Sequence, residues 1–265
     1  ADPIIVHPDV RRMLMTIKAI AEGSRSLVYF ASQHLDIAEY SENTKAKEGA
    51  EQLLSLITPI CKGFLTELGV EAANLGLQVL GGHGYIRESG MEQNVRDSRI
   101  STIYEGTTGI QALDLLGRKV LGSRTKLLQP LLKSLFDYAR SLQRHQSMCW
   151  CVAPLTEALQ IWQSCTATVA ESAVGDADEV GAAAHDYLMI SGYAMLAYLW
   201  ARMASVAEQK MADGCQDESF YRAKIHTAQF YFKRILPRIY THNAALKSGA
   251  SVLMGLDADD LQLNS

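Results

Sequence analysis

Apolar residues recur at helical spacing along almost the whole chain, and this pattern constrains its fold more than any other feature. In residues 10–35 they fall three or four positions apart, which places them on one face of a long helix. Only six prolines occur in 265 residues, and Asn-Gly or Asp-Gly turns are few, which argues against an all-β fold. We therefore predict an all-α fold. Further helices are predicted at residues 48–68, 70–80, 91–98, 107–121, 126–146, 154–174, 178–211 and 219–246.

Proline and glycine residues predict where these helices bend or end. Pro59 should kink the helix at residues 48–68, because its ring clashes with the carbonyl four residues earlier. Gly69 should interrupt the same helix, and Pro237 should kink the last one. A break near Gly122 divides the chain into two predicted helical bundles, at residues 1–122 and 123–265.

Composition argues against several classes of function. The net charge of −4 provides no basic field for nucleic acid. The five cysteines have neither the spacing of a disulfide framework nor that of a zinc site, so we expect reduced thiols, no metal and a cytoplasmic location. The most apolar run, residues 188–204, includes Ser191, Gly192 and Arg202, so we expect a buried helix rather than a membrane span.

Two glycine clusters, at residues 81–84 and 106–109, lie on either side of an Arg96-Asp97 pair. The first cluster is not a Walker loop, because no Gly-Lys-Ser/Thr sequence follows it. It is not a dinucleotide fingerprint either, because a helix precedes it instead of a strand. From the residues alone it is most simply a helix end and turn, and Arg96 and Asp97 most simply form a salt bridge that supports it.

A single acidic residue, Glu105, lies between Tyr104 and Gly106. Tyr104 could partly desolvate the carboxylate and raise its pKa, which would suit a general base. Gly106 would let a substrate approach the backbone, and the amides of the next helix could polarise a carbonyl or hold a phosphate. The spacing of Thr108 and Gln111 predicts a capping box at the start of that helix. From the residues alone, Glu105 is more simply an acidic residue favoured at a helix N-terminus.

Taken together, the motifs of residues 78–111 resemble the C-terminal helical domain of acyl-CoA dehydrogenases in order, spacing and residue type. The region after residue 122 resembles the extra C-terminal helical module of a larger subgroup that includes methylthiopropanoyl-CoA dehydrogenase-like enzymes. The matching motifs are Gln78-Val79-Leu80-Gly81-Gly82-His83-Gly84-Tyr85, Arg96-Asp97, Ile103-Tyr104-Glu105-Gly106-Thr107 and Ile110-Gln111.

The resemblance implies an FAD-dependent oxidoreductase of fatty acid metabolism that converts an acyl-CoA thioester to the trans-2-enoyl-CoA. Glu105 matches the base that removes the α-proton while a hydride passes from the β-carbon to the flavin. Tyr104 and Gly106 are implied to lie beside the substrate. Many dehydrogenases have a polar residue where this chain has Gly109. The residues implied to bind FAD are Gln78, Gly81, Gly82, Thr107 and Gly109.

The resemblance also implies partners and missing parts. The partners are an acyl-CoA substrate, an electron-transferring flavoprotein as electron acceptor, and further copies of the chain in a homo-oligomer. Family members begin with a helical domain and a β-domain, and neither they nor the first helix of the C-terminal domain is present before Ile4. We therefore expect an incomplete antiparallel bundle, in a fragment that is inactive alone and does not retain FAD. An acyl-CoA oxidase relative and a non-catalytic helical interaction module remain as alternatives.

Overall fold

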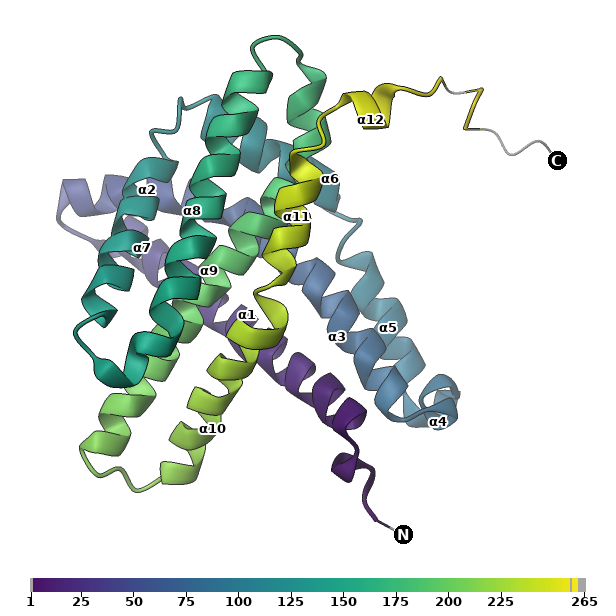
Figure 1. Ribbon diagram of the computed structural model, residues 1–265, viewed down its shortest axis with the longest axis vertical. Coiled ribbons are helices and arrows are strands. Elements are labelled where there is room, and N and C mark those ends of the chain that lie inside the picture. Colours follow the sequence, from purple (N-terminus) through teal and green to yellow (C-terminus); the bar gives the residue numbers. More distant parts are fainter. Residues whose placement is uncertain (1, 258, 262–265) are drawn as a thin grey trace.

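The computed structural model describes residues 2–257 and 259–261, and every regular element within them is helical (Figure 1). The all-α prediction is confirmed. In the labels, η marks 3₁₀-helical or π-helical segments. The elements are η1 (Ile4–Val6), α1 (Pro8–Tyr40), α2 (Thr44–Pro59), η2 (Ile60–Phe64), α3 (Leu65–Val79), α4 (Gly82–Tyr85), η3 (Arg87–Ser89), α5 (Met91–Ile100), α6 (Thr108–Leu113), η4 (Asp114–Leu121), α7 (Leu128–Leu142), η5 (Gln146–Met148), α8 (Cys149–Ser172), α9 (Asp178–Ala212), α10 (Glu218–Phe230), η6 (Tyr231–Ile235), α11 (Arg238–Leu246) and α12 (Ser251–Met254).

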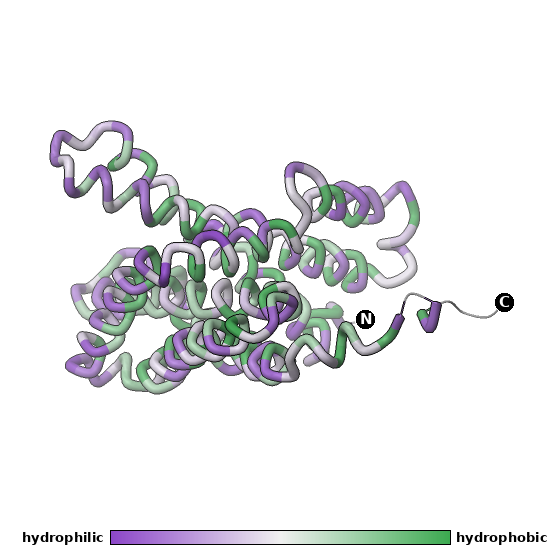
Figure 2. Tube along the Cα trace, turned by 90° about the horizontal axis from the view of Figure 1, so that it is seen from above, coloured by the Kyte–Doolittle hydropathy of each residue, from purple (hydrophilic) through white to green (hydrophobic). Residues whose placement is uncertain are grey.

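The first helix forms as its sequence predicts. Pro8 occupies the first turn of α1, where an N–H would have no partner within the helix, and Asp9 complements the positive end of the helix dipole. The helix then buries residues such as Met13, Ile20 and Leu27 against its neighbours. Figure 2 shows hydrophilic and hydrophobic residues alternating in short stretches along the outer helices, as expected for helices with one apolar face.

Helical structure continues past Pro59 and Gly69. After Pro59 the chain passes through the π-helical segment η2 directly into α3, so the proline is accompanied by a wider turn. The predicted interruption at Gly69 is wrong, because Gly69 lies inside α3. A glycine costs a helix about 1 kcal/mol relative to alanine, and the packing of α3 on α1 and α5 outweighs that cost.

Helix α9 is the centre of the fold. It packs against α1, η2, α6 and η4, which precede residue 122 in the sequence, and against α8, α10 and α11, which follow it (Figure 1). Its middle is buried on almost all sides, which confirms the expectation of a core helix at residues 188–204. One continuous apolar core includes residues from both predicted bundles.

One helical run among the described residues, Thr44–Val79, is long and apolar enough to cross a membrane. Length and composition alone are weak evidence for a span. Leu56, Ile57 and Phe64 of this run lie in the central core, so one side of it packs as a core helix does. The helices α3 and α5 with the short α4 form a hairpin that projects away from α7 and α8 (Figure 1).

Candidate active site

The predicted site residues lie in two places, at opposite ends of α5 (Figure 1). Gln78 belongs to the last turn of α3, and Gly81 and Gly82 follow at the tip of the hairpin. Residues 104–107 lie in the loop that connects α5 to α6. Helix α5 has 10 residues, so at 1.5 Å per residue these two places are about 15 Å apart.

Glu105 and Gly106 adopt consecutive left-handed backbone conformations, with φ angles of 51° and 96°. A left-handed backbone costs a residue with a side chain roughly 1–2 kcal/mol, because its Cβ crowds a carbonyl oxygen. A Cβ at Gly106 would lie 2.6 Å from the Nε2 atom of Gln111, but that atom ends a flexible side chain that can move aside, so the positive φ is what favours glycine here. The loop therefore requires glycine at 106, and it holds Glu105 in a conformation that most residues avoid.

The side chain of Glu105 is exposed. It makes no ion pair or side-chain hydrogen bond within the described part of the chain. Tyr104 is 53% exposed, and the Lys62 Nζ atom lies 5.4 Å from the centre of its ring. The Glu105 carboxylate is therefore open to solvent, and no described residue, Tyr104 included, shields it from water.

Hydrogen bonds from η2 and α3 anchor both ends of this loop. The Lys62 Nζ atom donates to the carbonyl of Ser101 at 2.5 Å. At the other end, the buried Thr108 hydroxyl donates to Glu67 at 2.6 Å. The amide of Thr108 also donates to the carbonyl of Thr102 at 3.1 Å, which closes the loop.

Sequence reasoning missed this anchoring set. Lys62 and Glu67 are charged residues within a largely apolar helical stretch, and that is the signal that could have identified them. A charged residue in such a position usually has a partner, because burying it unpaired is costly.

A capping box at Thr108 would make Thr108 the N-cap of α6, but the helix begins one residue earlier. Thr107 is its N-cap, and the Thr107 hydroxyl accepts a hydrogen bond from the amide of Ile110 at 3.3 Å. The predicted capping box is wrong, because the Thr108 side chain turns inward to Glu67. Gly109 lies on the exposed side of this first turn, and a Cβ there would meet nothing closer than the Thr107 hydroxyl at 4.0 Å.

At the hairpin tip, Gly81 has a φ of 57°. This left-handed angle accounts for glycine at the turn after α3. Gly82 follows in α4, and a Cβ on either glycine would meet no atom within 4 Å. The backbone of both residues is therefore open to a group that approaches from outside the chain.

The predicted Arg96–Asp97 salt bridge is wrong: no ion pair joins the two side chains, and both are exposed on α5. Adjacent residues on a helix point about 100° apart, so they do not face each other. Both instead line a shallow groove between α3 and α5 together with Val70, Asn74 and Ile103. Among the described residues, no group of three or more His, Cys, Asp or Glu side chains is placed to hold a metal.

Several large apolar side chains near Glu105 in the sequence are exposed. Their exposed fractions are 54% for Ile100, 49% for Ile103, 58% for Ile110 and 46% for Leu113. Ile100 and Ile103 both line the groove between α3 and α5, and adjoining exposed apolar side chains are typical of a surface that contacts another part of a protein or a ligand.

Two family models match the chain. The model described as "Acyl-CoA dehydrogenase, C-terminal domain" matches residues 1–121, and the one described as "Acetyl-CoA dehydrogenase C-terminal like" matches residues 133–257. The chain is also 36% identical, over 255 residues, to 3-methylmercaptopropionyl-CoA dehydrogenase of Ruegeria pomeroyi. This chain belongs to the acyl-CoA dehydrogenase family. It corresponds to the C-terminal region of that family.

The relatives show how much of an acyl-CoA dehydrogenase the chain spans. The Ruegeria alignment covers 96% of this chain but 43% of that protein. The broad-specificity linear acyl-CoA dehydrogenase FadE5 of Mycobacterium tuberculosis is 32% identical, and the alignment covers 97% of this chain and 43% of that protein. The chain thus spans less than half the length of these relatives.

Two solved structures share the fold. An acyl-CoA dehydrogenase complexed with FAD from Bacillus anthracis matches with a TM-score of 0.71 at 18% identity, covering 97% of this chain and 44% of that one. Caenorhabditis elegans ACDH-11 in complex with C11-CoA matches with a TM-score of 0.60 at 21% identity, covering 82% of this chain and 34% of that one. At these identities the matches show the fold alone.

The residues expected to bind FAD could form one side of an FAD-binding site. Gly81, Gly82 and Gly109 expose backbone with open space beside it, so a flat ring or a phosphate group can come close. Gln78 and Thr107 are also exposed, next to these glycines. The described residues do not cover the other sides of the space beside them.

Proposed function

We propose that this chain supplies the catalytic base of a flavin-dependent acyl-CoA dehydrogenase, with Glu105 removing the α-proton of the substrate thioester. The observation that supports this most is the left-handed conformation of Glu105, which leaves its carboxylate exposed and unpaired at the start of α6. Backbone strain of this kind is concentrated at functional sites. A glutamate that only favours a helix N-terminus needs no such conformation.

The surrounding groups suit the proton transfer. Gly106 and Thr107 separate Glu105 from α6, and among the first amides of that helix the Gly109 amide has no hydrogen-bond partner within the described residues. This amide and the positive end of the helix dipole can stabilise the charge that develops on a thioester carbonyl as the α-proton leaves. The proton passes to the Glu105 carboxylate, and the C–H electron pair becomes part of the new trans-2 double bond. A bound flavin would accept the hydride from the β-carbon. Tyr104 and Gly106 are the neighbours that would face the substrate.

The proposed cofactor contacts divide between the two ends of α5. Thr107 and Gly109 would contact the FAD that serves the Glu105 site. Gln78, Gly81 and Gly82, about 15 Å away by the length of α5, would contact the FAD of a neighbouring subunit. We accordingly propose a homo-oligomer. Its size follows from sedimentation at micromolar concentration, and a monomer would contradict the proposal.

The described residues do not enclose the space around Glu105. Glu105 is open to solvent and the apolar side chains near it are exposed, whereas a general base for an apolar substrate works best away from water. We propose that residues 1–265 alone retain little FAD and turn over little acyl-CoA. Stable yellow flavin and acyl-CoA turnover by these residues alone would contradict this.

We further propose a cytoplasmic dehydrogenase that passes electrons to an electron-transferring flavoprotein, instead of an acyl-CoA oxidase. The Glu105–Gln111 motif and the dehydrogenase relatives support this choice. In the protein that contains this chain, the reduced flavin should be reoxidised rapidly by an electron-transferring flavoprotein and slowly by oxygen. Rapid reoxidation by oxygen would instead identify an oxidase.

The role of Glu105 is tested by Glu105→Gln in the protein that contains this chain, loaded with FAD. Removal of a general base should lower kcat by about 10²–10⁴-fold, while acyl-CoA still binds. Glu51→Gln is a matched control, because it makes the same change at an exposed residue of α2. A loss of only a few fold in Glu105→Gln would contradict the assignment.

A further inference from the structure

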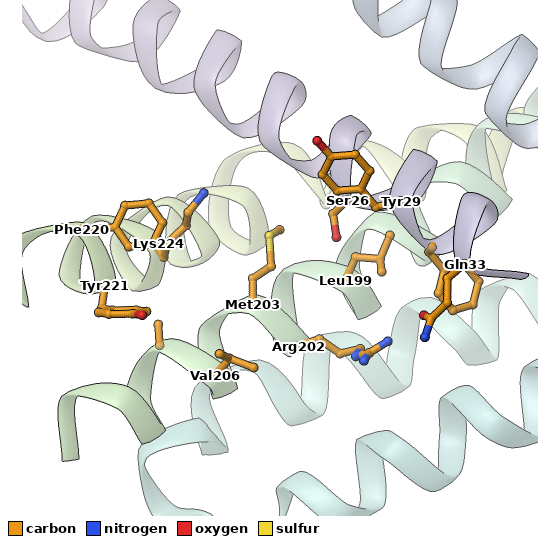
Figure 3. Close-up of a pocket in the computed structure, with 12 residues that line it drawn as sticks. Ser26, Tyr29, Gln33, Leu199, Arg202, Met203, Val206, Phe220, Tyr221 and Lys224 are labelled. Atoms are coloured by element: carbon orange, nitrogen blue, oxygen red, sulfur yellow. The ribbon is translucent and has the colours of Figure 1, made fainter. Parts of the chain in front are cut away.

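A cavity that is open to solvent lies away from the Glu105 loop, between α1, α9 and α10 (Figure 3). Its volume is about 350 Å³, which is at the small end of the range for ligand sites in proteins. Leu199, Met203 and Val206 follow one face of α9 along it, and Phe220 and Tyr221 of α10 lie opposite. The walls are therefore largely apolar and aromatic.

The charged residues that line this cavity are both cations, Arg202 and Lys224. Arg202 forms no ion pair with the described residues. Its guanidinium carbon lies 5.6 Å from the centre of the Tyr198 ring, and its Nη1 atom donates to the Tyr198 hydroxyl at 3.5 Å, the limit of a hydrogen bond. A guanidinium has five N–H donors, so most of those on Arg202 remain available to an anion.

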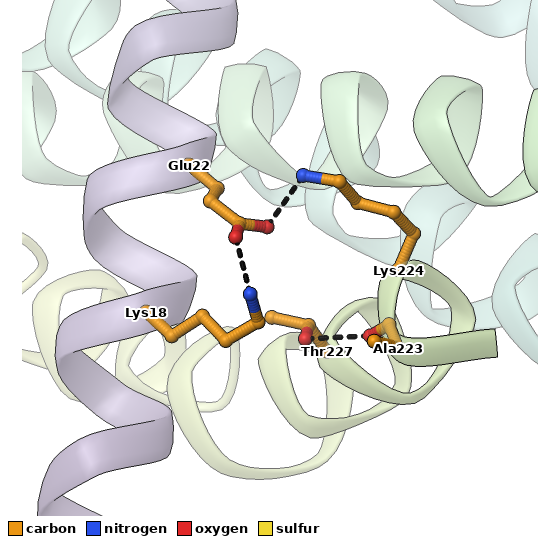
Figure 4. Close-up of polar contacts among 5 residues, drawn as sticks. All are labelled: Lys18, Glu22, Ala223, Lys224 and Thr227. Atoms are coloured by element: carbon orange, nitrogen blue, oxygen red, sulfur yellow. Dashed lines mark hydrogen bonds and ion pairs between the residues drawn. The ribbon is translucent and has the colours of Figure 1, made fainter. Parts of the chain in front are cut away.

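The other end of the cavity is also positive. The Lys224 Nζ atom lies 2.7 Å from the Glu22 carboxylate, and Lys18 pairs with the same carboxylate (Figure 4). Two ammonium groups thus share one negative charge, which leaves a net positive charge at this end. The Lys224 ammonium also lies 5.2 Å from the centre of the Phe220 ring.

We propose that this cavity binds a small carboxylate with an apolar body. The carboxylate would pair with Arg202, whose planar guanidinium suits two parallel hydrogen bonds to such a group. The body would lie on Met203, Val206 and Phe220. Residues 199–206 of α9 extend over seven helical steps, or about 10 Å, so a single ring or a medium-length chain fits. This inference does not depend on the role proposed for Glu105.

Calorimetric titration of the full chain with octanoate tests the proposal. Octanoate should bind with one equivalent per chain, and octylammonium, which has the same body and the opposite charge, should bind at least about tenfold more weakly. Arg202→Gln should weaken octanoate binding by about tenfold or more. Arg222→Gln, which removes an exposed charge from α10 outside the cavity, should leave it unchanged.

A second variant tests the apolar half of the cavity. Val206 is 58% exposed, so Val206→Trp should fold, fill the cavity and abolish octanoate binding. Equal binding of the two probes, or octanoate affinity that neither variant changes, would overturn the proposal. It would also be overturned if sedimentation showed the chain self-associating through this face, with Val206→Trp dissociating the oligomer and octanoate failing to bind.

Discussion

The hydroxyl of Thr108 donates a 2.6 Å hydrogen bond to the carboxylate of Glu67, which ties the first turn of α6 to α3. Thr108 is buried, so this bond has little competition from water. The loop with Glu105 ends at this residue, and Lys62 holds its other end through Ser101. The position of the proposed base is therefore determined by the helix that precedes it by about forty residues, as well as by the loop itself.

Thr108→Val keeps the shape of the side chain but removes the donor to Glu67. The free energy of unfolding should fall by about 1–3 kcal/mol, because a partly buried carboxylate loses its partner. In the protein that contains this chain, kcat should fall with little change in KM, because the base moves. Thr108→Ser should restore both quantities. If Thr108→Val lost stability but kept the kcat of the unmodified protein, the bond would be structural only.

Gly106→Ala should destabilise the chain by about 1–2 kcal/mol, because φ at this position is 96°, which residues with a Cβ rarely adopt. Gly109→Ala is the matched control three positions later, where a Cβ has room and the residue is in a helix. There alanine should leave stability unchanged or raise it slightly. Chemical denaturation of both variants measures the difference, and equal effects would contradict the account of the loop.

Gly192→Ala should be strongly destabilising, because a Cβ on Gly192 would overlap the Phe64 ring where α9 packs on η2. Overpacking of this kind typically costs about 1–3 kcal/mol. Gly181→Ala in the same helix is the control, since a Cβ there meets no atom within 4 Å. Adding Phe64→Leu to Gly192→Ala should recover part of the loss. Fully additive losses in denaturation would show that the two residues do not interact.

Glu22 should make stability depend on pH. Burial raises the pKa of Glu22, but hydrogen bonds and charges from Lys18 and Lys224 outweigh burial and hold it below the usual 4.5. When the pKa of a carboxyl group is lower in the folded state, its stabilising contribution is fully present above the pKa of the unfolded state. That contribution is lost as pH falls through the pKa of the folded state. Below about pH 4.5 the unmodified chain should therefore lose more stability than Glu22→Gln. Identical pH profiles of the unfolding free energy would contradict this.

The helical architecture could be predicted because apolar spacing and local punctuation agree along the chain. Pro8 begins α1, a break follows residue 121, and α9 runs from Asp178 to Ala212, close to the predicted 178–211. The error at Gly69 has a physical cause: packing of α3 outweighs the weak helix propensity of one glycine. The division into bundles at 1–122 and 123–265 stays a prediction.

The residues assigned to the candidate site stay a prediction, and their contacts could not be predicted from the sequence. The order of glycines around Glu105 identified the loop, yet no local pattern shows that Thr108 turns inward to Glu67, which is distant in sequence. The adjacency of Arg96 and Asp97 in the sequence suggests a pair, but on a helix their side chains point about 100° apart. Long-range side-chain partners depend on how helices pack, and a single sequence specifies that packing only indirectly.

The most direct test of Glu105 as the base is hydrogen exchange at the α-carbon of the substrate. The protein that contains this chain, with FAD bound, is incubated with a non-oxidisable acyl-CoA analogue in D₂O, and deuterium uptake is followed by mass spectrometry. The unmodified protein should exchange the α-hydrogens, whereas Glu105→Gln should bind the analogue and exchange them at least about a hundredfold more slowly. Exchange by Glu105→Gln at the unmodified rate would contradict the central claim.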